Sequence, residues 1–145
     1  MNLIVDTNII ISALITPEGT IADLIFNKPD KSILVSPRFM FDELQEKNKK
    51  ILKITGYSEK SFSELLYLIR KNIEFIDDNL ITSENLEKAY QLVQDIDKKD
   101  LLFVAFSLQT GFAIWTGDLK LINGLRKKRF TNVLSTKDLI KRIKR

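Results

Sequence analysis

Short apolar runs alternate with longer segments of helical periodicity along this chain. The runs are rich in β-branched and aromatic residues and are bounded by turn-forming residues, as buried strands of a parallel sheet tend to be. We therefore predict strands at about residues 2–6, 32–35, 73–76, 112–115 and 131–134. Because helical segments separate these strands, the pattern predicts an α/β fold with right-handed crossovers.

The intervals between the predicted strands contain residues that typically begin and end helices. We expect helices over about residues 8–14, from beyond Gly19 to about 27, from 36 to 53, from 58 onward, from 82 or 83 to 93, from 97 or 98 to 109, and over 135–145. Ser36-Pro37 predicts the start of the third helix, because a hydroxyl N-cap followed by proline favours that position. Ser135 is expected to cap a basic C-terminal helix. No Gly- or Pro-rich linker interrupts the pattern, so residues 1–145 are expected to form a single domain.

Two of the predicted strands lead into an acidic residue. Asp6 directly follows the apolar run 3–5, and Asp118 lies three residues beyond the run 112–115. In a doubly wound sheet of order 3-2-1-4-5 the switch point, where ligands bind, lies between the first and fourth strands. With that order, Asp6 and Asp118 face each other across one crevice.

Two further acids can reach the same edge of the sheet. Glu43 lies about two turns into the helix that leaves the second strand. Asp100 precedes the apolar segment 101–108, which must start at the carboxyl edge if it is to enter the fourth strand from the opposite edge. Asp97, one turn earlier, is a second candidate in this region. Each acid taken singly also has a structural explanation, as a helix cap, a helix-dipole partner, a turn residue or a solvated charge.

The composition excludes many kinds of active site. The chain contains no cysteine and no histidine, which excludes disulfides, thiolate nucleophiles, Cys/His zinc sites and catalytic triads that use imidazole. Its 44% hydrophobic and 29% charged residues are typical of a globular domain. No apolar stretch approaches the roughly 20 residues of a membrane span, and the N-terminus shows no signal-peptide pattern. A cytoplasmic location is therefore expected.

The set of four acids predicts a metal site. Converging carboxylates without basic partners repel one another, so either their pKa values rise or a cation lies among them. In a chain without histidine or cysteine, Mg²⁺ or Mn²⁺ is the cofactor that such oxygen ligands favour. The chemistry that fits this site is phosphodiester hydrolysis by a metal-activated water.

Positive charge is concentrated at the C-terminal end of the chain. Residues 1–118 carry 13 Lys/Arg and 18 Asp/Glu, whereas residues 119–145 carry 10 Lys/Arg and one acid, Asp138. Such a segment attracts polyanions, although a solvated terminal helix explains it equally well. The candidate RNA-binding residues are Arg126, Lys127, Lys128 and Arg129.

The ordered motifs resemble those of PIN domains, the metal-dependent ribonuclease fold of many bacterial and archaeal toxin–antitoxin modules. The resemblance runs from the first residues to about Ser135, which is nearly the whole chain. The matching pieces are residues 4–8 with Ser12 downstream, Glu43 after the second strand, residues 97–100 before the apolar helix, and residues 115–118.

This resemblance implies a five-stranded parallel sheet of order 3-2-1-4-5 flanked by helices, with Mg²⁺- or Mn²⁺-dependent cleavage of single-stranded RNA. It also implies a homodimer and, for VapC-like toxins of type II modules, a cognate antitoxin protein. Whether Asp97 or Asp100 is the primary ligand stays open. The catalytic and metal-binding acids that the resemblance implies are Asp6, Glu43, Asp100 and Asp118, and the supporting residues are Asn8, Thr116 and Asp97.

Other classes of protein match the residues less well. A haloacid-dehalogenase-like phosphatase needs a second Asp two residues after the first, where this chain has Asn8. A response-regulator receiver needs an acidic pair near the first strand and a lysine after the fifth, where this chain has Ser135. Two alternatives stay open: a housekeeping RNA-processing nuclease, and a catalytically silent PIN-like RNA-binding or interaction module.

Overall fold

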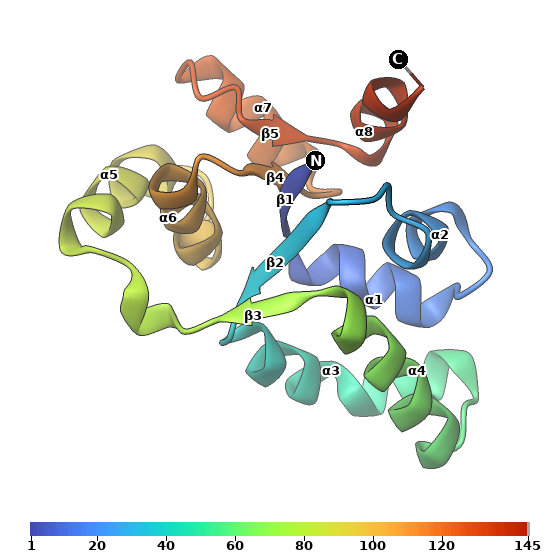
Figure 1. Cartoon of the computed structure of the whole chain (residues 1–145). Coiled ribbons are helices and arrows are strands. Elements are labelled where there is room, and N and C mark those ends of the chain that lie inside the picture. Colours follow the sequence, from blue (N-terminus) through green and yellow to red (C-terminus); the bar gives the residue numbers. More distant parts are fainter. Residues whose placement is uncertain (145) are drawn as a thin grey trace.

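Five parallel strands form one sheet at the centre of the molecule (Figure 1). The computed structural model describes residues 1–144, except for the side chain of Phe41. The strand order is β3-β2-β1-β4-β5, so the predicted α/β fold and its 3-2-1-4-5 order are confirmed. The strands are β1 (Asn2–Val5), β2 (Ile33–Pro37), β3 (Glu74–Ile76), β4 (Ala113–Trp115) and β5 (Val133–Leu134).

The helices fill the intervals that the periodicity predicted. Ser58, Thr82 and Ser135 each accept a hydrogen bond from a backbone amide of the helix that they precede, as expected of N-caps. In residues 1–144 no single helix is long and apolar enough to cross a membrane. The helices α1 (Thr7–Ile15) and α2 (Thr20–Phe26) reach that length and apolar character only when taken together, and the chain bends by 107° between them. The helices are α1 (Thr7–Ile15), α2 (Thr20–Phe26), α3 (Met40–Thr55), α4 (Glu59–Asn72), α5 (Ser83–Val93), α6 (Leu101–Thr110), α7 (Leu119–Lys127) and α8 (Thr136–Ile143), with single 3₁₀ turns η1 (Asp78–Leu80) and η2 (Lys98–Asp100).

The predicted helix start at Ser36-Pro37 is wrong. Both residues belong to β2, and α3 begins at Met40. The register with β3 continues to the end of β2, where Pro37 pairs with Ile76. The Ser36 hydroxyl donates a 3.0 Å hydrogen bond to the carbonyl of Val5 in the neighbouring strand instead of capping a helix. The strand continues because it has a partner on each side, and the local sequence does not contain that information.

Strand residues point alternately into two apolar layers. Leu3 and Val5 pack in the layer that contains α1, α2, α3, α4 and α8, whereas Ile4 packs in the layer that contains α5, α6 and α7. None of these three side chains is more than 1% exposed. Because both faces of the sheet are covered by apolar side chains, the edges where strands end are the part of the sheet that is open to a polar site.

The register between β1 and β4 defines the carboxyl edge of the sheet. Val5 pairs with Trp115, so Asp6 and Thr116 are the next residues on two adjacent strands. The amide of Asp6 donates a 3.1 Å hydrogen bond to the carbonyl of Trp115, which continues the pairing by one step. Because helices that follow parallel strands begin at this edge, α1 and α7 start here, and η2 leads into α6 from the same side.

Candidate acidic site at the carboxyl edge of the sheet

The structure brings Asp6 and Asp118 together through one hydroxyl. Thr116 is fully buried, and its hydroxyl donates a 2.6 Å hydrogen bond to Oδ2 of Asp6. The same hydroxyl oxygen accepts a 3.1 Å hydrogen bond from the amide of Asp118. Thr116 therefore connects the carboxylate of Asp6 to the backbone of Asp118.

Asp6 is a buried acid that is held by a side chain rather than by a helix terminus. It is 5% exposed and stands at the N-cap position of α1, but its carboxylate makes no capping hydrogen bond with the described chain. Burial raises the pKa of Asp6, whereas the Thr116 hydroxyl and the nearby amides of Asn8 and Thr7 oppose that rise. Helix capping therefore does not explain the acid at this position.

Asp118 caps a helix and also affects the other acids of the site through its charge. Its Oδ1 accepts hydrogen bonds from the amides of Lys120 at 3.0 Å and Leu121 at 3.2 Å, so it is the N-cap of α7. Its charge contributes to the raised pKa of both Asp6 and Asp100. The cap orients a carboxylate that also faces the other two acids.

Asp100 is the acid with the strongest indication of a missing partner. It lies where η2 passes into α6, it is 8% exposed, and its Oδ2 has no hydrogen-bond partner among residues 1–144. Burial, followed by the charges of Asp6, Asp97, Asp118 and Glu43, raises the pKa of Asp100 to about 7. A buried carboxylate oxygen without a partner costs free energy, which a bound cation or proton would recover.

The structure separates the roles of Asp97 and Asp100. Asp97 is exposed, and its Oδ1 accepts a 2.9 Å hydrogen bond from the amide of Lys99, so it caps η2. Asp100 points inward from the end of the same turn and is buried. Asp97 acts on the acidic site through its charge, which contributes to the raised pKa of Asp100.

Glu43 reaches the site from the first turns of α3. It is half-buried, and burial together with the charge of Asp6 raises its pKa, while Lys47 one turn later acts in the opposite direction. The hydroxyl of Thr7, which the sequence reasoning did not single out, is near Glu43 and opposes the rise in its pKa, although its geometry does not meet that of a hydrogen bond. The Thr7 hydroxyl is buried and makes no hydrogen bond with any described residue. Its position next to Asp6 at the helix start was the signal available in the sequence.

Asn8 is exposed, whereas Thr116 is buried, although the resemblance to PIN domains gave both as residues that support the acids. Its side chain is exposed on α1, and its amide is one of the groups that oppose the rise in the pKa of Asp6. Thr116 is the supporting residue that the structure places in direct contact with an acid.

The donor set fits a hard divalent cation in its chemistry. Asp6, Glu43 and Asp100 each have a raised pKa that is caused in part by the charge of another acid in the set. This mutual repulsion and the unpartnered oxygen of Asp100 are what an oxygen-ligated cation would relieve. In the described residues, however, no three acidic side chains lie close enough together to hold an ion as they stand. A ligand set of three carboxylates would therefore require these side chains to lie closer together than they do in this arrangement.

The basic cluster is only partly available to a ligand. Arg126 donates a 2.9 Å hydrogen bond to Asp138 of the α8 capping box, and Lys128 forms an ion pair with Asp95. Lys127 and Arg129 are exposed. Because α7 starts at Asp118 and ends at Lys127, this cluster lies about 13 Å along the helix from the acids.

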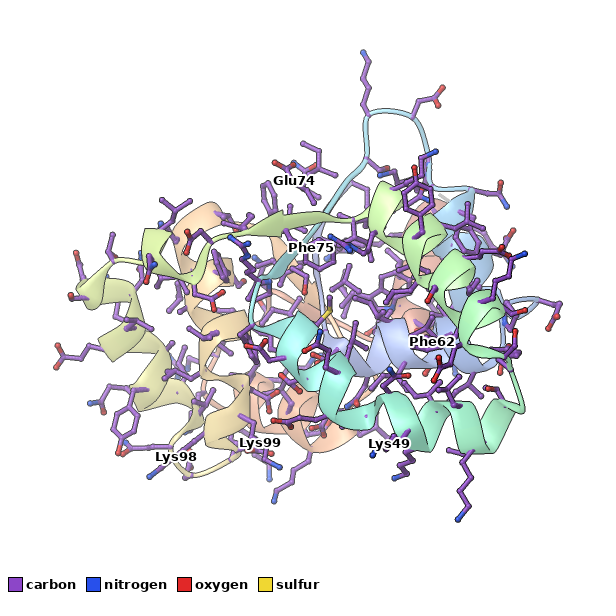
Figure 2. The ribbon with its side chains drawn as sticks, turned by 90° about the horizontal axis from the view of Figure 1, so that it is seen from below. Lys49, Phe62, Glu74, Phe75, Lys98 and Lys99 are labelled. Atoms are coloured by element: carbon purple, nitrogen blue, oxygen red, sulfur yellow. The ribbon has the colours of Figure 1, made fainter. Side chains whose placement is uncertain are left out.

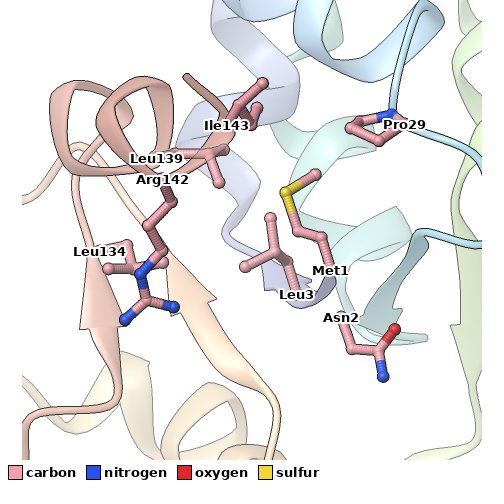
Figure 3. A pocket seen from close by; sticks show the side chains of 8 residues that line it. All are labelled: Met1, Asn2, Leu3, Pro29, Leu134, Leu139, Arg142 and Ile143. Carbon is pink, nitrogen blue, oxygen red and sulfur yellow. The ribbon is translucent and has the colours of Figure 1, made fainter. Parts of the chain in front are cut away.

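A separate hollow of about 310 Å³ lies between the amino end of β1, β5 and α8 (Figure 3). Its lining is mainly apolar, with Leu3, Leu134 and Leu139 in its wall and Arg142 at its side. No acidic residue lines it, so it is distinct from the acidic site.

Comparisons with known proteins give the same fold. A family model described as PIN domain matches residues 4–138. A chain in the crystal structure of VapBC2 from Rickettsia felis bound to a DNA fragment from their promoter is similar, with 15% sequence identity and a TM-score of 0.68. The match covers 93% of this chain and 97% of that chain. No curated protein sequence matches the chain.

Proposed function

Because this chain belongs to the PIN domain family, we propose that it is a metal-dependent endoribonuclease that hydrolyses phosphodiester bonds of single-stranded RNA. The observation that carries this proposal is the buried, unpartnered oxygen of Asp100 beside Asp6. A buried acid in this state supports a binding site for a cation, because a purely structural carboxylate would be hydrogen-bonded.

Asp6, Asp100 and Asp118 would hold Mg²⁺ or Mn²⁺, with Glu43 as a further ligand. Such a cation supplies a water of lowered pKa at neutral pH and neutralises charge on the scissile phosphate. Thr116 keeps the Asp6 carboxylate oriented through its 2.6 Å hydrogen bond. Where Glu43 is not a ligand, it would instead orient the attacking water and accept its proton, a role that its raised pKa favours.

The polyanionic substrate needs positive charge around this acidic centre. The exposed Lys127 and Arg129 attract RNA at long range, together with the other cations of residues 119–145. Arg126 and Lys128 contribute less in this proposal, because both are engaged in ion pairs.

We further propose that the protein is the toxin of a toxin–antitoxin pair and acts in the cytoplasm as a homodimer. The fold that it shares with a chain of the VapBC2 structure supports this proposal. A cognate antitoxin protein would then block the acidic site. Co-expression with the product of a small neighbouring gene that suppresses RNA cleavage would support a toxin. A neighbouring product without that effect would favour a housekeeping RNA-processing nuclease.

The nuclease proposal is tested by incubating purified protein with single-stranded RNA in Mg²⁺, in Mn²⁺ and in EDTA. We expect cleavage with either metal, none in EDTA, and none by Asp6→Asn. Lys60→Ala on α4 is the matched control, because Lys60 is exposed and belongs to neither the acidic site nor the basic cluster. RNA binding without metal-dependent cleavage would instead identify a catalytically silent binding module.

A further inference from the structure

Tyr90 and Lys98 lie against each other beside the acidic site. Tyr90 is near the end of α5, its side chain is 40% exposed, and the Nζ of Lys98 is 6.0 Å from the centre of its ring. Lys98 is in η2, two residues before the buried Asp100. A partly exposed aromatic ring and a cation thus lie together at the turn that carries Asp100.

The geometry of η2 separates the cations from the acid. Asp97 caps the turn through the amide of Lys99, at 2.9 Å. As a result Asp100 points into the protein, while Lys98 and Lys99 are exposed. Figure 2 shows Lys98 and Lys99 side by side along one margin of the molecule, with Lys49 of α3 further along the same margin.

A further cation lies next to Glu43 on α3. Lys47, one turn after Glu43 on α3, is exposed and close enough to Glu43 to lower its pKa. Exposed lysines of η2 and of α3 therefore accompany Asp100 and Glu43, two of the acids of the site. Such an arrangement suits a chain of phosphates that crosses the site, because the cations offset the repulsion by the carboxylates.

Resting on the proposed nuclease function, we propose that Tyr90, Lys98 and Lys99 form a subsite for one unpaired nucleotide next to the scissile phosphate. The base stacks on the exposed face of Tyr90, and the ammonium groups of Lys98 and Lys99 bind the adjoining phosphate. Aromatic rings beside a cationic track are the usual means of binding single-stranded nucleic acid. A base in a duplex is already stacked and paired, so this subsite selects single strands.

A second tyrosine–lysine pair in the chain serves as a control for Tyr90 and Lys98. On α4, the Nζ of Lys71 lies 5.3 Å from the ring centre of Tyr67, and Tyr67 is 61% exposed. This second tyrosine–lysine pair lies in the half of α4 that leads into the amino end of β3. It is therefore at the opposite edge of the sheet from the acids. Tyr67 is more exposed than Tyr90 and its lysine is closer to the ring, so only its location makes it unsuited to bind RNA at the acidic site.

The test is binding of a labelled 12-nucleotide single-stranded RNA to the full chain in EDTA, measured by fluorescence anisotropy. We expect Tyr90→Ala and Tyr90→Leu to weaken binding about tenfold, and Tyr90→Phe to retain it. Tyr90→Leu keeps an apolar side chain of similar size, so its loss of binding reports the ring rather than the fold. Tyr67→Ala should bind as wild type.

The lysines are tested through salt dependence. Lys98→Ala and Lys99→Ala should each lower the slope of log Kd against log salt concentration by about 0.7, whereas Lys71→Ala should not change it. With duplex RNA of the same length, Tyr90→Ala should bind as wild type does. Equal losses at Tyr67 and Tyr90, no loss at Tyr90, or the same loss with duplex RNA would each overturn the subsite.

These outcomes are distinct from failure of the nuclease proposal. If metal-dependent cleavage is absent but binding depends on Tyr90, the nuclease is wrong and the subsite stands as part of an RNA-binding surface. If Asp6→Asn abolishes cleavage while Tyr90→Leu leaves binding and cleavage unchanged, the nuclease stands and the subsite is wrong.

Discussion

The hydroxyl of Thr116 donates a 2.6 Å hydrogen bond to Oδ2 of Asp6, across 110 residues of sequence. Both residues directly follow strands that pair in the centre of the sheet, at Val5 and Trp115. The bond holds a buried carboxylate in one orientation and, through the amide of Asp118, connects it to the start of α7. It is thus the contact through which the sheet organises the acidic site.

Replacing Thr116 with valine should weaken both the fold and the activity. Valine keeps the volume but leaves Oδ2 of Asp6 without its donor, which should lower the free energy of unfolding by about 1–2 kcal/mol. Because Thr116 orients Asp6, which is a metal ligand in the proposed nuclease, its loss should reduce the proposed RNA cleavage about 10- to 100-fold. Urea unfolding followed by the fluorescence of Trp115, the single tryptophan, measures the first effect.

Thr116→Ser is the matched control for that change. Serine retains the donor and loses only a methyl group, so it should retain most of the cleavage activity and lose less stability than valine. Equal loss of cleavage in the two variants would show that the methyl packing, and not the hydrogen bond, supports the site.

The stability of the metal-free protein should fall as pH rises through the titration of Asp100. Its pKa is about 7 in the folded protein, against about 3.9 in an unfolded chain, so the folded state binds more protons between these values. Where the folded state binds more protons, the free energy of unfolding falls with rising pH. Asp100→Asn removes this titration and should therefore unfold at a higher urea concentration than wild type at pH 8.

At pH 5 the stabilisation of Asp100→Asn relative to wild type should fall to about a third, because Asp100 is then protonated in the folded protein while it is still mostly ionised in the unfolded chain. Urea midpoints of wild type and Asp100→Asn in EDTA at both pH values measure the difference. A variant that is less stable than wild type at pH 8 would mean that Asp100 has a structural partner.

Mg²⁺ or Mn²⁺ should raise the melting temperature of the wild-type protein at pH 8. A ligand that binds only the folded state stabilises it by about 2.7 kcal/mol at a concentration 100 times its Kd. Asp100→Asn should show little of this shift, because it lacks the charge of the buried acid. Equal shifts in both proteins, recorded by thermal unfolding at matched ionic strength, would place the cation elsewhere.

Arg126 should contribute to stability more than to RNA binding. It joins α7 to the capping box of α8 through Asp138 and also donates a 3.2 Å hydrogen bond to the carbonyl of Val133. Arg126→Met should lower the free energy of unfolding by about 0.5–1 kcal/mol, since the ion pair is partly exposed. Lys127→Met should leave stability unchanged and weaken RNA binding, with urea unfolding and anisotropy as the two measurements.

Local patterns were sufficient for the elements and for the placement of the acids. The apolar runs, the hydroxyl caps at Ser58 and Ser135 and the glycine that ends α6 identified strands and helices, because each signal acts within a few residues. The position of Asp6 after a strand was enough to place it at a sheet edge. The strand order itself came from the resemblance to PIN domains.

Long-range contacts decided the remaining features. Ser36-Pro37 carries a local helix-start signal, yet pairing with β3 and the bond to Val5 make it a strand end. Arg126 and Lys128 look alike in sequence to Lys127 and Arg129, and only the approach of Asp138 and Asp95 distinguishes them.

The sequence by itself determined the alternation of strands and helices, the absence of cysteine and histidine ligands, and the four acids expected at one edge of the sheet. The tertiary structure decided which of these acids is buried, which oxygen lacks a partner and which hydroxyl orients a carboxylate. The physical reason is that burial and hydrogen bonding depend on residues far apart in the chain. Asp97 and Asp100 are three positions apart in one motif, and only packing makes one an exposed cap and the other a buried acid with a pKa of about 7.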